Sequence, residues 1–323
     1  MNISGGSVLS KTILNINEIS VDNIRFLFGP QDLYLKTVED VFECKISFVD
    51  GVITVEKVEV STIMALKRVF NDILKLIDSK KDIDVVDIRK IAESARNGSK
   101  GSAKELYNKP IGVSFEHKMI YPKTAGQQNL VETLHNKDMI FVSGPAGTGK
   151  TFLAVVYAVD KLRNEEVRKI IITRPVVEAG ENLGFLPGDL KEKVDPYLRP
   201  IYDALHYMFG QIQTERYLER GVIEIAPLAY MRGRTLDDAI IILDEAQNTT
   251  TMQMRMFLTR MGFHSKMIIT GDTTQVDLPN NKTSGFMDAW NRLKDINEIG
   301  FVELGSEDVV RHPLVKKILH KYE

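Results

Sequence analysis

The fold of this chain is decided by residues 144–151, which read Gly144-Pro145-Ala146-Gly147-Thr148-Gly149-Lys150-Thr151. The stretch fits the pattern G-x-x-x-x-G-K-[ST], which marks a phosphate-binding loop where a strand precedes it and a helix follows. Residues 139–143 are apolar and predict a buried strand, and residues 152–159 predict a buried helix. A chance glycine-rich turn before a helix is the alternative, but it would not explain the full match together with both flanks.

The residue types in this loop suit a triphosphate. Glycines let the backbone approach crowded phosphate oxygens, and the N–H groups at the start of a helix attract an anion. Lys150 brings a compact positive charge to the outer phosphates, and Thr151 offers a hydroxyl to Mg²⁺. We therefore expect residues 144–151 to bind a nucleotide, with ATP as the substrate and Mg²⁺ as the cofactor.

A pair of carboxylates forms the second half of the expected site. Residues 240–243 are apolar and predict a buried strand, and Asp244 and Glu245 follow it directly. A carboxylate at the end of such a strand can hold Mg²⁺ through water, and its neighbour can deprotonate an attacking water molecule. We assign the metal role to Asp244, together with Thr151, and the water-activating role to Glu245.

Further apolar runs predict other strands of the same sheet, over residues 169–173, 222–225, 266–270 and 300–304. Continuous apolar strands are typical of a parallel sheet that is covered on both faces. The run 266–270 leads into Gly271-Asp272-Thr273-Thr274-Gln275, beside the strand that carries the acidic pair. We assign Gln275 as the residue that senses the γ-phosphate.

Two neighbouring glutamines, Gln127 and Gln128, lie just upstream of the phosphate-binding loop. A glutamine in this place can pair with N6 and N7 of adenine. Similarity to the Q-motif of helicases favours Gln127 as the adenine-binding residue. An ordinary helix-capping segment is the alternative.

Composition limits the class of protein. The chain has 323 residues, a net charge of −2 and a single cysteine, Cys44. The balanced charge argues against a globally basic nucleic-acid coat protein but leaves room for a local basic groove. One cysteine excludes an internal disulfide and a cysteine zinc site. No apolar run approaches the ~18 residues of a membrane span, so we expect a soluble, cytoplasmic protein with no membrane partner.

The N-terminal part predicts a small α+β domain over residues 22–80, after a polar N-terminal tail over residues 1–21. A first irregular strand within residues 1–20 is the alternative to a mobile tail. The patterns predict a strand over 24–28, a helix over 33–42, a hairpin of 45–49 with 52–55 around Asp50-Gly51, and a helix over 63–77. This unit resembles a KH-like module, which binds single-stranded RNA through a GXXG loop. The corresponding turn, Gly29-Pro30-Gln31-Asp32, lacks the second glycine and carries a carboxylate. An adaptor that docks a partner or packs on the ATPase is therefore equally open.

Segments outside the strands are candidates for contact with nucleic acid. Residues 81–120 predict a helix near 83–91 and then a basic linker. Residues 176–221 form a long excursion between two expected strands, and such excursions commonly carry function. Residues 230–235 form a compact cationic loop. Three arginines, at the end of one strand and in this loop, are assigned to nucleic-acid binding: Arg174, Arg232 and Arg234.

Taken together, the motifs over residues 120–315 resemble those of the PhoH family of ATPases. The order and spacing of the following segments carry the resemblance: 143–151, 173–176, 184–188, 231–235, 244–248, 271–275 and 308–312. The resemblance implies a RecA-like P-loop NTPase domain over residues 121–323, ATP hydrolysis, and an RNA helicase or RNA-remodelling role. For bacterial members it also implies work beside an rRNA-processing endoribonuclease.

The same motifs are similar to the first motor domain of superfamily-1 helicases, in which a second motor domain closes over ATP. Only 49 residues follow Thr274, whereas a domain needs ~100. We therefore expect a homo-oligomer, a ring or another head-to-tail assembly, in which a neighbouring subunit supplies an arginine finger. The candidates are Arg311, Arg260 and Arg232, and Arg311 is placed among the catalytic residues with Lys150, Glu245 and Gln275. A surface or structural salt bridge is the alternative for each.

Three functions are weighed on this basis. The first is an ATPase coupled to single-stranded RNA, in RNA processing or ribosome maturation. The second is a nucleotide-dependent switch or adaptor that recruits a partner nuclease without unwinding. The third is a small-molecule or protein kinase, against which the Asp244-Glu245 pair argues because it suits activation of water.

Overall fold

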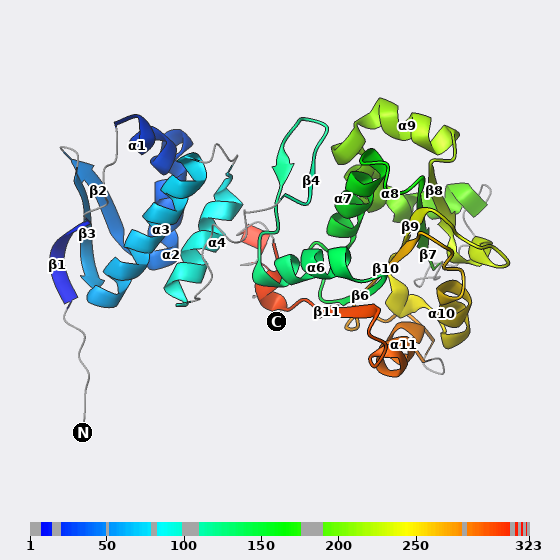
Figure 1. The fold of residues 1–323 in the computed structure, drawn as a ribbon. Helices are drawn as coiled ribbons and strands as arrows, with labels where there is room; N and C mark the ends of the chain where they lie inside the picture. Colours follow the sequence, from blue (N-terminus) through cyan, green and yellow to red (C-terminus); the bar gives the residue numbers. More distant parts are fainter. Residues whose placement is uncertain are drawn as a thin grey trace, which may run out of the picture. The chain divides into compact units, whose positions relative to one another are not determined.

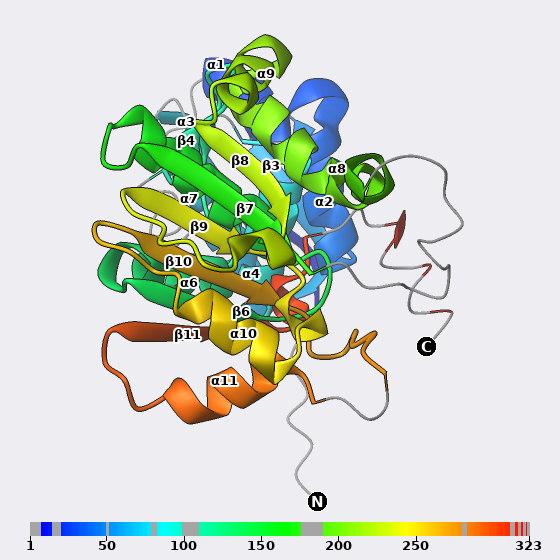
Figure 2. The same cartoon turned by 90° about the vertical axis from the view of Figure 1, so that its right-hand side faces the viewer.

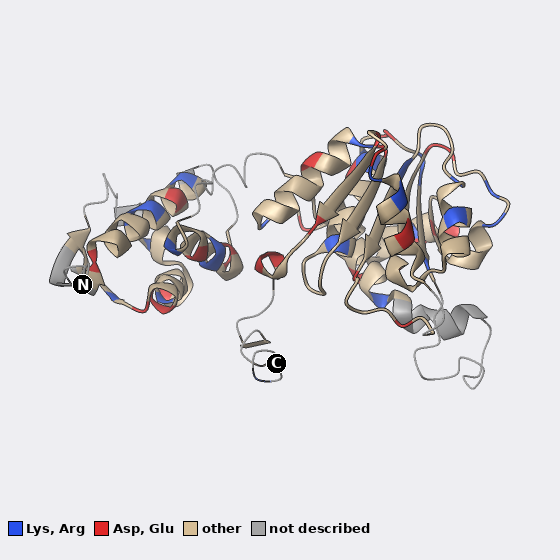
Figure 3. Ribbon diagram, turned by 90° about the horizontal axis from the view of Figure 1, so that it is seen from below, with Lys and Arg blue, Asp and Glu red and all other residues tan. Residues whose placement is uncertain are grey.

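The chain forms two compact units, Met1–Lys109 and Pro110–Glu323 (Figure 1). The computed structural model describes residues 8–14, 21–49, 52–78, 83–98, 110–175, 190–279, 283–310, 314, 315, 318 and 321. Basic and acidic residues lie close together on helices of both units (Figure 3), in keeping with the net charge of −2. Among the described helices, none is long and apolar enough to cross a membrane.

The first unit is a small α+β fold with an antiparallel sheet. Its strands are β1 (Val8–Leu14), β2 (Lys45–Val49) and β3 (Val52–Glu59), in the order β1-β3-β2. Its helices are α1 (Val21–Phe28), α2 (Leu33–Phe42), α3 (Val60–Asp78) and α4 (Val85–Arg96), with the single-turn helix η1 (Pro30–Asp32) between α1 and α2. The helix α4 packs against α2 and α3. The predicted α+β region is thus confirmed, and whether it binds RNA in the manner of a KH-like module stays a prediction.

One expectation for this unit is wrong. Residues 24–28 form part of a helix, not a strand: Leu27 is fully buried while its neighbour Phe26 is 62 % exposed. A strand with Ile24, Phe26 and Phe28 inward would require Phe26 buried and Leu27 exposed, so helical spacing prevails over the apparent alternation. Residues 8–14, for which the sequence leaves both a tail and a first strand open, form β1, which pairs with β3 from Val8↔Glu59 to Leu14↔Ile53.

The second unit is built on a six-stranded sheet in which every neighbouring pair is parallel. The order is β11-β6-β10-β9-β7-β8, which Figure 2 shows from edge to edge. The strands are β6 (Met139–Ser143), β7 (Lys169–Arg174), β8 (Ile223–Pro227), β9 (Ala239–Leu243), β10 (Lys266–Gly271) and β11 (Ile299–Glu303). This confirms the mostly parallel α/β sheet, with strand ends within two residues of those expected.

Helices cover both faces of this sheet (Figure 2). One face packs against α6 (Ala125–Asn136), α7 (Lys150–Arg163) and α8 (Leu190–Phe209), and the other packs against α10 (Thr251–Leu258) and α11 (Gly285–Leu293). The helix α9 (Gln211–Glu219) connects α8 to β8, and a short hairpin of β4 (Gly112–Val113) and β5 (Met119–Ile120) precedes α6. The first core lies between the sheet and α6, α7 and α8, and the second core lies between the sheet and α10 and α11. Along β6, Ile140 and Val142 point into the first core and Phe141 points into the second. This alternation leaves no polar face, which explains the continuous apolar runs.

Four aromatic rings pack together in the second core, against β6, the strand that leads into the phosphate-binding loop. Phe141 stacks on Phe301 with ring centroids 5.3 Å apart, and its centroid lies 5.7 Å from that of Phe286. Trp290 is half-buried, and its ring meets Phe141 edge-on at 6.4 Å. These contacts fix the strand that leads into residues 144–151.

Replacing Phe141 with alanine should lower the free energy of unfolding by about 3–5 kcal/mol, because it removes a fully buried ring and leaves a cavity. Chemical denaturation followed by the fluorescence of Trp290, the single tryptophan, would measure the loss. The matched control is Phe263→Ala, since Phe263 is 84 % exposed. Equal losses in the two variants would contradict the packing described here.

Candidate functional site

The loop 144–151 leaves the carboxyl end of β6 and is clamped by the ends of two neighbouring strands. The N–H of Gly144 donates to the carbonyl of Gly271, 3.2 Å away at the end of β10. A Cβ atom on Gly144 would lie 2.6 Å from the carbonyl oxygen of Leu304, just past β11. Gly149, with a φ of 84°, begins α7 in a left-handed conformation. The glycines are thus required by close approach and by backbone angle, as expected for a loop that wraps phosphates.

Gln127 braces this loop from α6. Its Nε2 donates to the carbonyl of Thr148 at 3.0 Å, and its Oε1 accepts from the N–H of Lys123 at 2.7 Å. The side chain is 4 % exposed. Gln128, the other candidate, instead donates to Glu132 within α6. Adenine binding by Gln127 stays a prediction, and it would require the amide to exchange these two bonds.

A segment near the C-terminus joins the same loop. The N–H of Val310 donates to the carbonyl of Gly147 at 2.9 Å. The buried carboxylate of Asp308 accepts from the N–H of Gly126 at 3.2 Å and from that of Gly305 at 2.9 Å. Asp308 therefore ties the start of α6 to the end of β11, which explains why the motif 308–312 accompanies the phosphate-binding loop. Arg311 lies outside the described residues, so its catalytic role stays a prediction.

Lys150 is the first residue of α7, and its ammonium group is held inside the loop. Nζ donates to the carbonyl oxygens of Gly144 at 2.5 Å and Pro145 at 3.0 Å. Burial lowers the pKa of this ammonium, and three carboxylates oppose the shift: Asp272, Glu245 and Asp244. The loop carbonyls thus hold the ammonium group of Lys150 inside the loop. The β- and γ-phosphates of a bound nucleotide would replace these carbonyls as its partners.

Asp244 lies at the end of β9, within reach of the loop. Its Oδ1 accepts hydrogen bonds from the hydroxyls of Thr151 and Thr270, each at 2.7 Å. The predicted metal pair, Thr151 and Asp244, is therefore brought together from positions 93 residues apart. Hydroxyl and carboxylate oxygens are the donors that Mg²⁺ prefers, and Mg²⁺ completes its shell with water and phosphate. Thr270 was not expected, although it ends the apolar run of β10.

Glu245 is held by two side chains. Its Oε1 lies 3.1 Å from Nη2 of Arg174, and its Oε2 accepts from Nε2 of Gln247 at 2.5 Å. Nη1 of Arg174 also lies 4.0 Å from Oδ2 of Asp244. Arg174, assigned from sequence to nucleic-acid binding, thus lies against both acidic residues of the site. Its place at the end of β7, a strand next to β9, was the available signal.

Gln247 links the acidic pair to the loop that follows β10. Its Oε1 accepts from the N–H of Asp272 at 3.0 Å, and its Nε2 donates to the carbonyl of Gln275 at 3.1 Å. Asp272 is buried, and its Oδ2 has no hydrogen-bond partner among the described residues. Such a carboxylate suits a site that receives a cation or ordered water. Gln275 is exposed and keeps its predicted γ-phosphate role as a prediction.

The loop and the ends of β9 and β10 line one cavity of about 640 Å³, within the range of small-molecule sites. The loop contributes Ala146, Gly147, Gly149, Lys150 and Thr151, and the strand ends contribute Asp244, Glu245, Gly271, Asp272 and Gln275. The remaining wall was missed from sequence and consists of Phe152, Pro200, Asp203, Ala204 and Tyr207. The sequence contained a signal for this wall, because Pro200, Asp203, Ala204 and Tyr207 follow helical spacing within the excursion 176–221.

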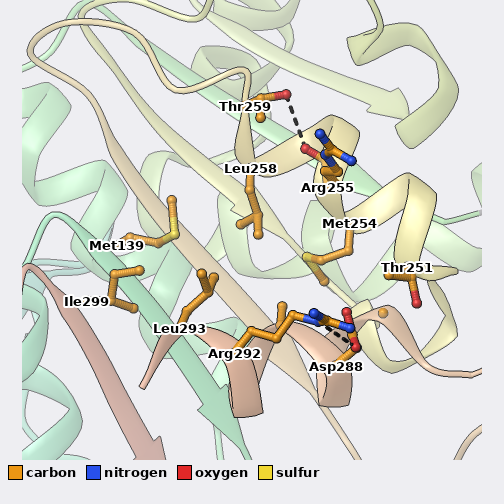
Figure 4. A pocket seen from close by; sticks show the side chains of 12 residues that line it. Met139, Thr251, Met254, Arg255, Leu258, Thr259, Asp288, Arg292, Leu293 and Ile299 are labelled. Atoms are coloured by element: carbon orange, nitrogen blue, oxygen red, sulfur yellow. Dashed lines mark hydrogen bonds and ion pairs between the residues drawn. The ribbon is translucent and has the colours of Figure 1, made fainter. Parts of the chain in front are cut away.

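A second cavity, of about 620 Å³, lies between α10 and α11 (Figure 4). Its lining is largely apolar, with Met254, Leu258 and Leu293 pointing inward. An ion pair of Arg292 with Asp288, 2.8 Å apart, closes one side. None of the phosphate-binding or acidic motif residues lines it, so the first cavity is the candidate functional site.

The remaining candidate arginines occupy different surroundings. Arg234 forms a two-bonded ion pair with Glu224, at 2.5 and 2.7 Å, which lowers the pKa of that carboxyl and raises the pKa of the guanidinium. Arg260 donates to the carbonyl of Arg234 at 2.9 Å. Both therefore support the loop 230–235, whereas Arg232 is exposed on it. Their roles toward nucleic acid or a neighbouring subunit stay predictions.

Known proteins of one family are similar to this chain. The profile of the PhoH family, described as "PhoH-like protein", matches residues 119–323. A PhoH-like protein of Bacillus subtilis is 52 % identical over 302 residues, covering 94 % of each chain. A PhoH-like protein of Mycobacterium bovis is 44 % identical over 306 residues, covering 94 % of this chain and 86 % of its own. Protein PhoH of Escherichia coli K12 is 46 % identical over 205 residues, 63 % of this chain and 58 % of its own.

The resemblance drawn from the motifs is thereby confirmed over most of the chain, and the cavity described above lies within the matched region. This protein belongs to the PhoH-like family of P-loop nucleotide-binding proteins.

Proposed function

We propose that this protein hydrolyses ATP with Mg²⁺ and couples the reaction to single-stranded RNA. The observation that carries the proposal is the convergence of Lys150, Thr151, Asp244 and Glu245 on one cavity. Backbone N–H groups of the loop bind the phosphates, and Lys150 exchanges its loop carbonyls for phosphate oxygens. Mg²⁺ held through Thr151 and Asp244 neutralises phosphate charge when it is bound.

Glu245 is the proton acceptor for the attacking water in this proposal. A carboxylate serves as a general base only where it can reach the water. Both of its oxygens are bonded to side chains, one to Arg174 and one to Gln247. We expect hydrolysis to be faster when the pair of Glu245 with Arg174 loosens, because the carboxylate can then turn toward the water. This makes Arg174 a positioning residue that controls when the carboxylate acts.

The coupling to RNA is supported by where cationic residues lie in the sheet. Carboxyl ends of parallel strands share one edge, so the segments after β7 and β8 lie at the same edge as the phosphate-binding loop. Arg232 follows β8 and is exposed, and Arg174 ends β7. RNA that binds along this edge would act on Arg174 directly. A homo-oligomer that supplies an arginine finger, with Arg311 as a candidate, and a partner endoribonuclease remain parts of the proposal.

A second candidate function is the nucleotide-dependent switch that recruits a partner nuclease. The engaged state of Glu245 favours it, because a protein that holds its general base in an ion pair hydrolyses ATP slowly. In that case ATP binding, not turnover, would control the docking of the partner.

The catalytic assignments are tested by two substitutions. Lys150→Ala should weaken ATP binding by about ten-fold or more, because charged hydrogen bonds to phosphate are lost. Glu245→Gln should keep ATP binding and lower kcat by about 10²–10⁴-fold, the range of general-base catalysis. Calorimetry would measure binding, and phosphate release would measure turnover. Lys294→Ala and Glu219→Gln, at exposed positions outside the cavity, are the matched controls. Normal turnover in Glu245→Gln would remove the proposed base.

The role of Arg174 has its own test. Arg174→Ala should raise RNA-independent turnover by about five-fold or more, because it frees Glu245. Arg174→Lys should retain much of the restraint, since the charge remains. Steady-state ATPase assays without RNA would measure both. A fall of Arg174→Ala to the level of Glu245→Gln would show instead that the guanidinium takes part in the chemistry.

RNA coupling separates the two candidate functions. Single-stranded RNA should raise kcat for ATP in the wild-type protein, and Arg232→Ala should weaken this stimulation and its salt dependence because a phosphate contact is lost. ATPase assays over a series of RNA and salt concentrations would measure the effect. Turnover that no RNA changes, with binding of a nuclease that depends on ATP, would favour the switch.

A further inference from the structure

The cavity beside the phosphate-binding loop has a wall that the phosphates and Mg²⁺ do not need. Phe152 and the helix α8 form this wall, with Pro200, Asp203, Ala204 and Tyr207 facing the cavity. Apart from the hydroxyl of Tyr207, none of these side chains can donate a hydrogen bond to a phosphate, because they are apolar or negatively charged. Such a wall suits a flat or apolar part of a ligand better than its phosphates.

The sequence of α8 separates two faces. Residues Pro200, Asp203, Ala204 and Tyr207 recur at i, i+3, i+4 and i+7, which places them on one side of a helix. Leu198, Ile201, Leu205 and Met208 recur at i, i+3, i+7 and i+10 on a neighbouring stripe and are buried in the core with α7, and Ala204 also contacts that core. The helix is therefore anchored by one stripe and presents the other to the cavity.

Two aromatic rings meet on this wall. The ring centroids of Phe152 and Tyr207 lie 5.8 Å apart, with planes tilted by 53°. Tyr207 remains 42 % exposed despite this contact. Its backbone is fixed, because its carbonyl accepts the N–H of Phe115 at 3.0 Å. An exposed aromatic ring on a fixed backbone offers a stacking surface for another flat ring.

The direction of the bound nucleotide connects this wall to the loop. Lys150 reaches the β- and γ-phosphates, and the loop N–H groups hold the α- and β-phosphates. The chain then runs from Thr151 to Phe152, so Phe152 is the first side chain past the phosphate-binding residues. The nucleoside, attached to the α-phosphate, is the part of the ligand left to meet the wall.

We propose that the base of the bound nucleotide stacks on Tyr207, beside Phe152, and that Asp203 accepts an N–H from its exocyclic amine. The inference rests on the proposed nucleotide site and names its base-binding part. A carboxylate only accepts hydrogen bonds, so it favours adenine, which presents an amine at position 6, over hypoxanthine, which presents an oxygen there. Gln127 then acts as a brace of the loop through Thr148, as its two bonds show.

The experiment compares three ligands by calorimetry with Mg²⁺ on the full chain: ATP, ITP and inorganic tripolyphosphate. Tyr207→Leu should weaken ATP binding by about ten-fold, the loss expected for one stacked base, and leave tripolyphosphate binding unchanged. Tyr207→Phe keeps the ring and should stay within about two-fold of the wild type. Phe263→Leu, at an exposed aromatic residue outside the cavity, is the matched control.

Asp203 is tested by the ratio of the ATP and ITP affinities. The wild type should prefer ATP by about five-fold or more, and Asp203→Asn should bring the ratio close to one. The ratio is insensitive to the general gain in phosphate binding that loss of a negative charge produces, which tripolyphosphate reports separately.

Three results would overturn the inference. The first is an ATP affinity of Tyr207→Leu equal to that of the wild type. The second is an equal loss for ATP and tripolyphosphate, which would mean a disturbed loop. The third is weaker RNA binding with unchanged ATP binding, which would assign the wall to RNA. Failure of the proposed ATPase would appear as absent turnover with ATP binding intact, and the binding comparison would still decide the base site.

Discussion

The hydrogen bond from the hydroxyl of Thr151 to Oδ1 of Asp244, 2.7 Å long, is the contact on which the rest of the site depends. It joins the start of α7, the helix after β6, to the end of β9. The strands β6 and β9 do not pair with each other. The strand β10 lies between them, and Thr270 on this strand donates to the same carboxylate oxygen. The buried carboxylate of Asp244 therefore fixes the ends of β9 and β10 and the start of α7 relative to one another, around the place where a triphosphate and its metal would bind.

The parallel sheet makes this contact possible. In a parallel sheet all strands end at one edge, and functional residues placed just after the strands meet there without further design. Arg174, Asp244, Glu245 and Asp272 come from three strand ends, and Gly144 leaves a fourth. The cost is electrostatic, because three carboxylates gather in a confined space. Lys150 and Arg174 supply the positive charge that balances them, and each is already engaged within the site.

The parts of the site that could be predicted are those that follow strands. Continuous apolar runs identify the strands because both faces are buried, and the polar residue after each run is a candidate by position alone. Prediction failed where the apolar residues fit both a strand and a helix. Ile24, Phe26 and Phe28 alternate as in a strand, yet Leu27 and Phe28 are buried and Phe26 is exposed. It also failed for pairings across the sheet, since nothing local in the sequence shows that Arg174 meets Glu245.

The wall of α8 illustrates a different limit. The helical spacing of Pro200, Asp203 and Tyr207 can be read from the sequence. These residues are apolar, charged and aromatic, so their spacing predicts no function until the cavity beside them is known. Gln127 suggests adenine binding by its position, and this stays a prediction. Its contacts with Thr148 and Lys123 also give it a place in the framework of the loop. A motif therefore identifies the phosphate-binding loop directly, whereas the choice of a base-binding residue also needs the cavity and its contacts.

The most direct test of the central claim is a crystal structure with Mg²⁺ and a non-hydrolysable ATP analogue. The account predicts that the triphosphate lies over the N–H groups of residues 147–151, with the metal at the hydroxyl of Thr151 on the side of Asp244 and the ammonium of Lys150 moved from its loop carbonyls to the outer phosphates. A triphosphate bound elsewhere, or a metal bound away from both Thr151 and Asp244, would contradict it.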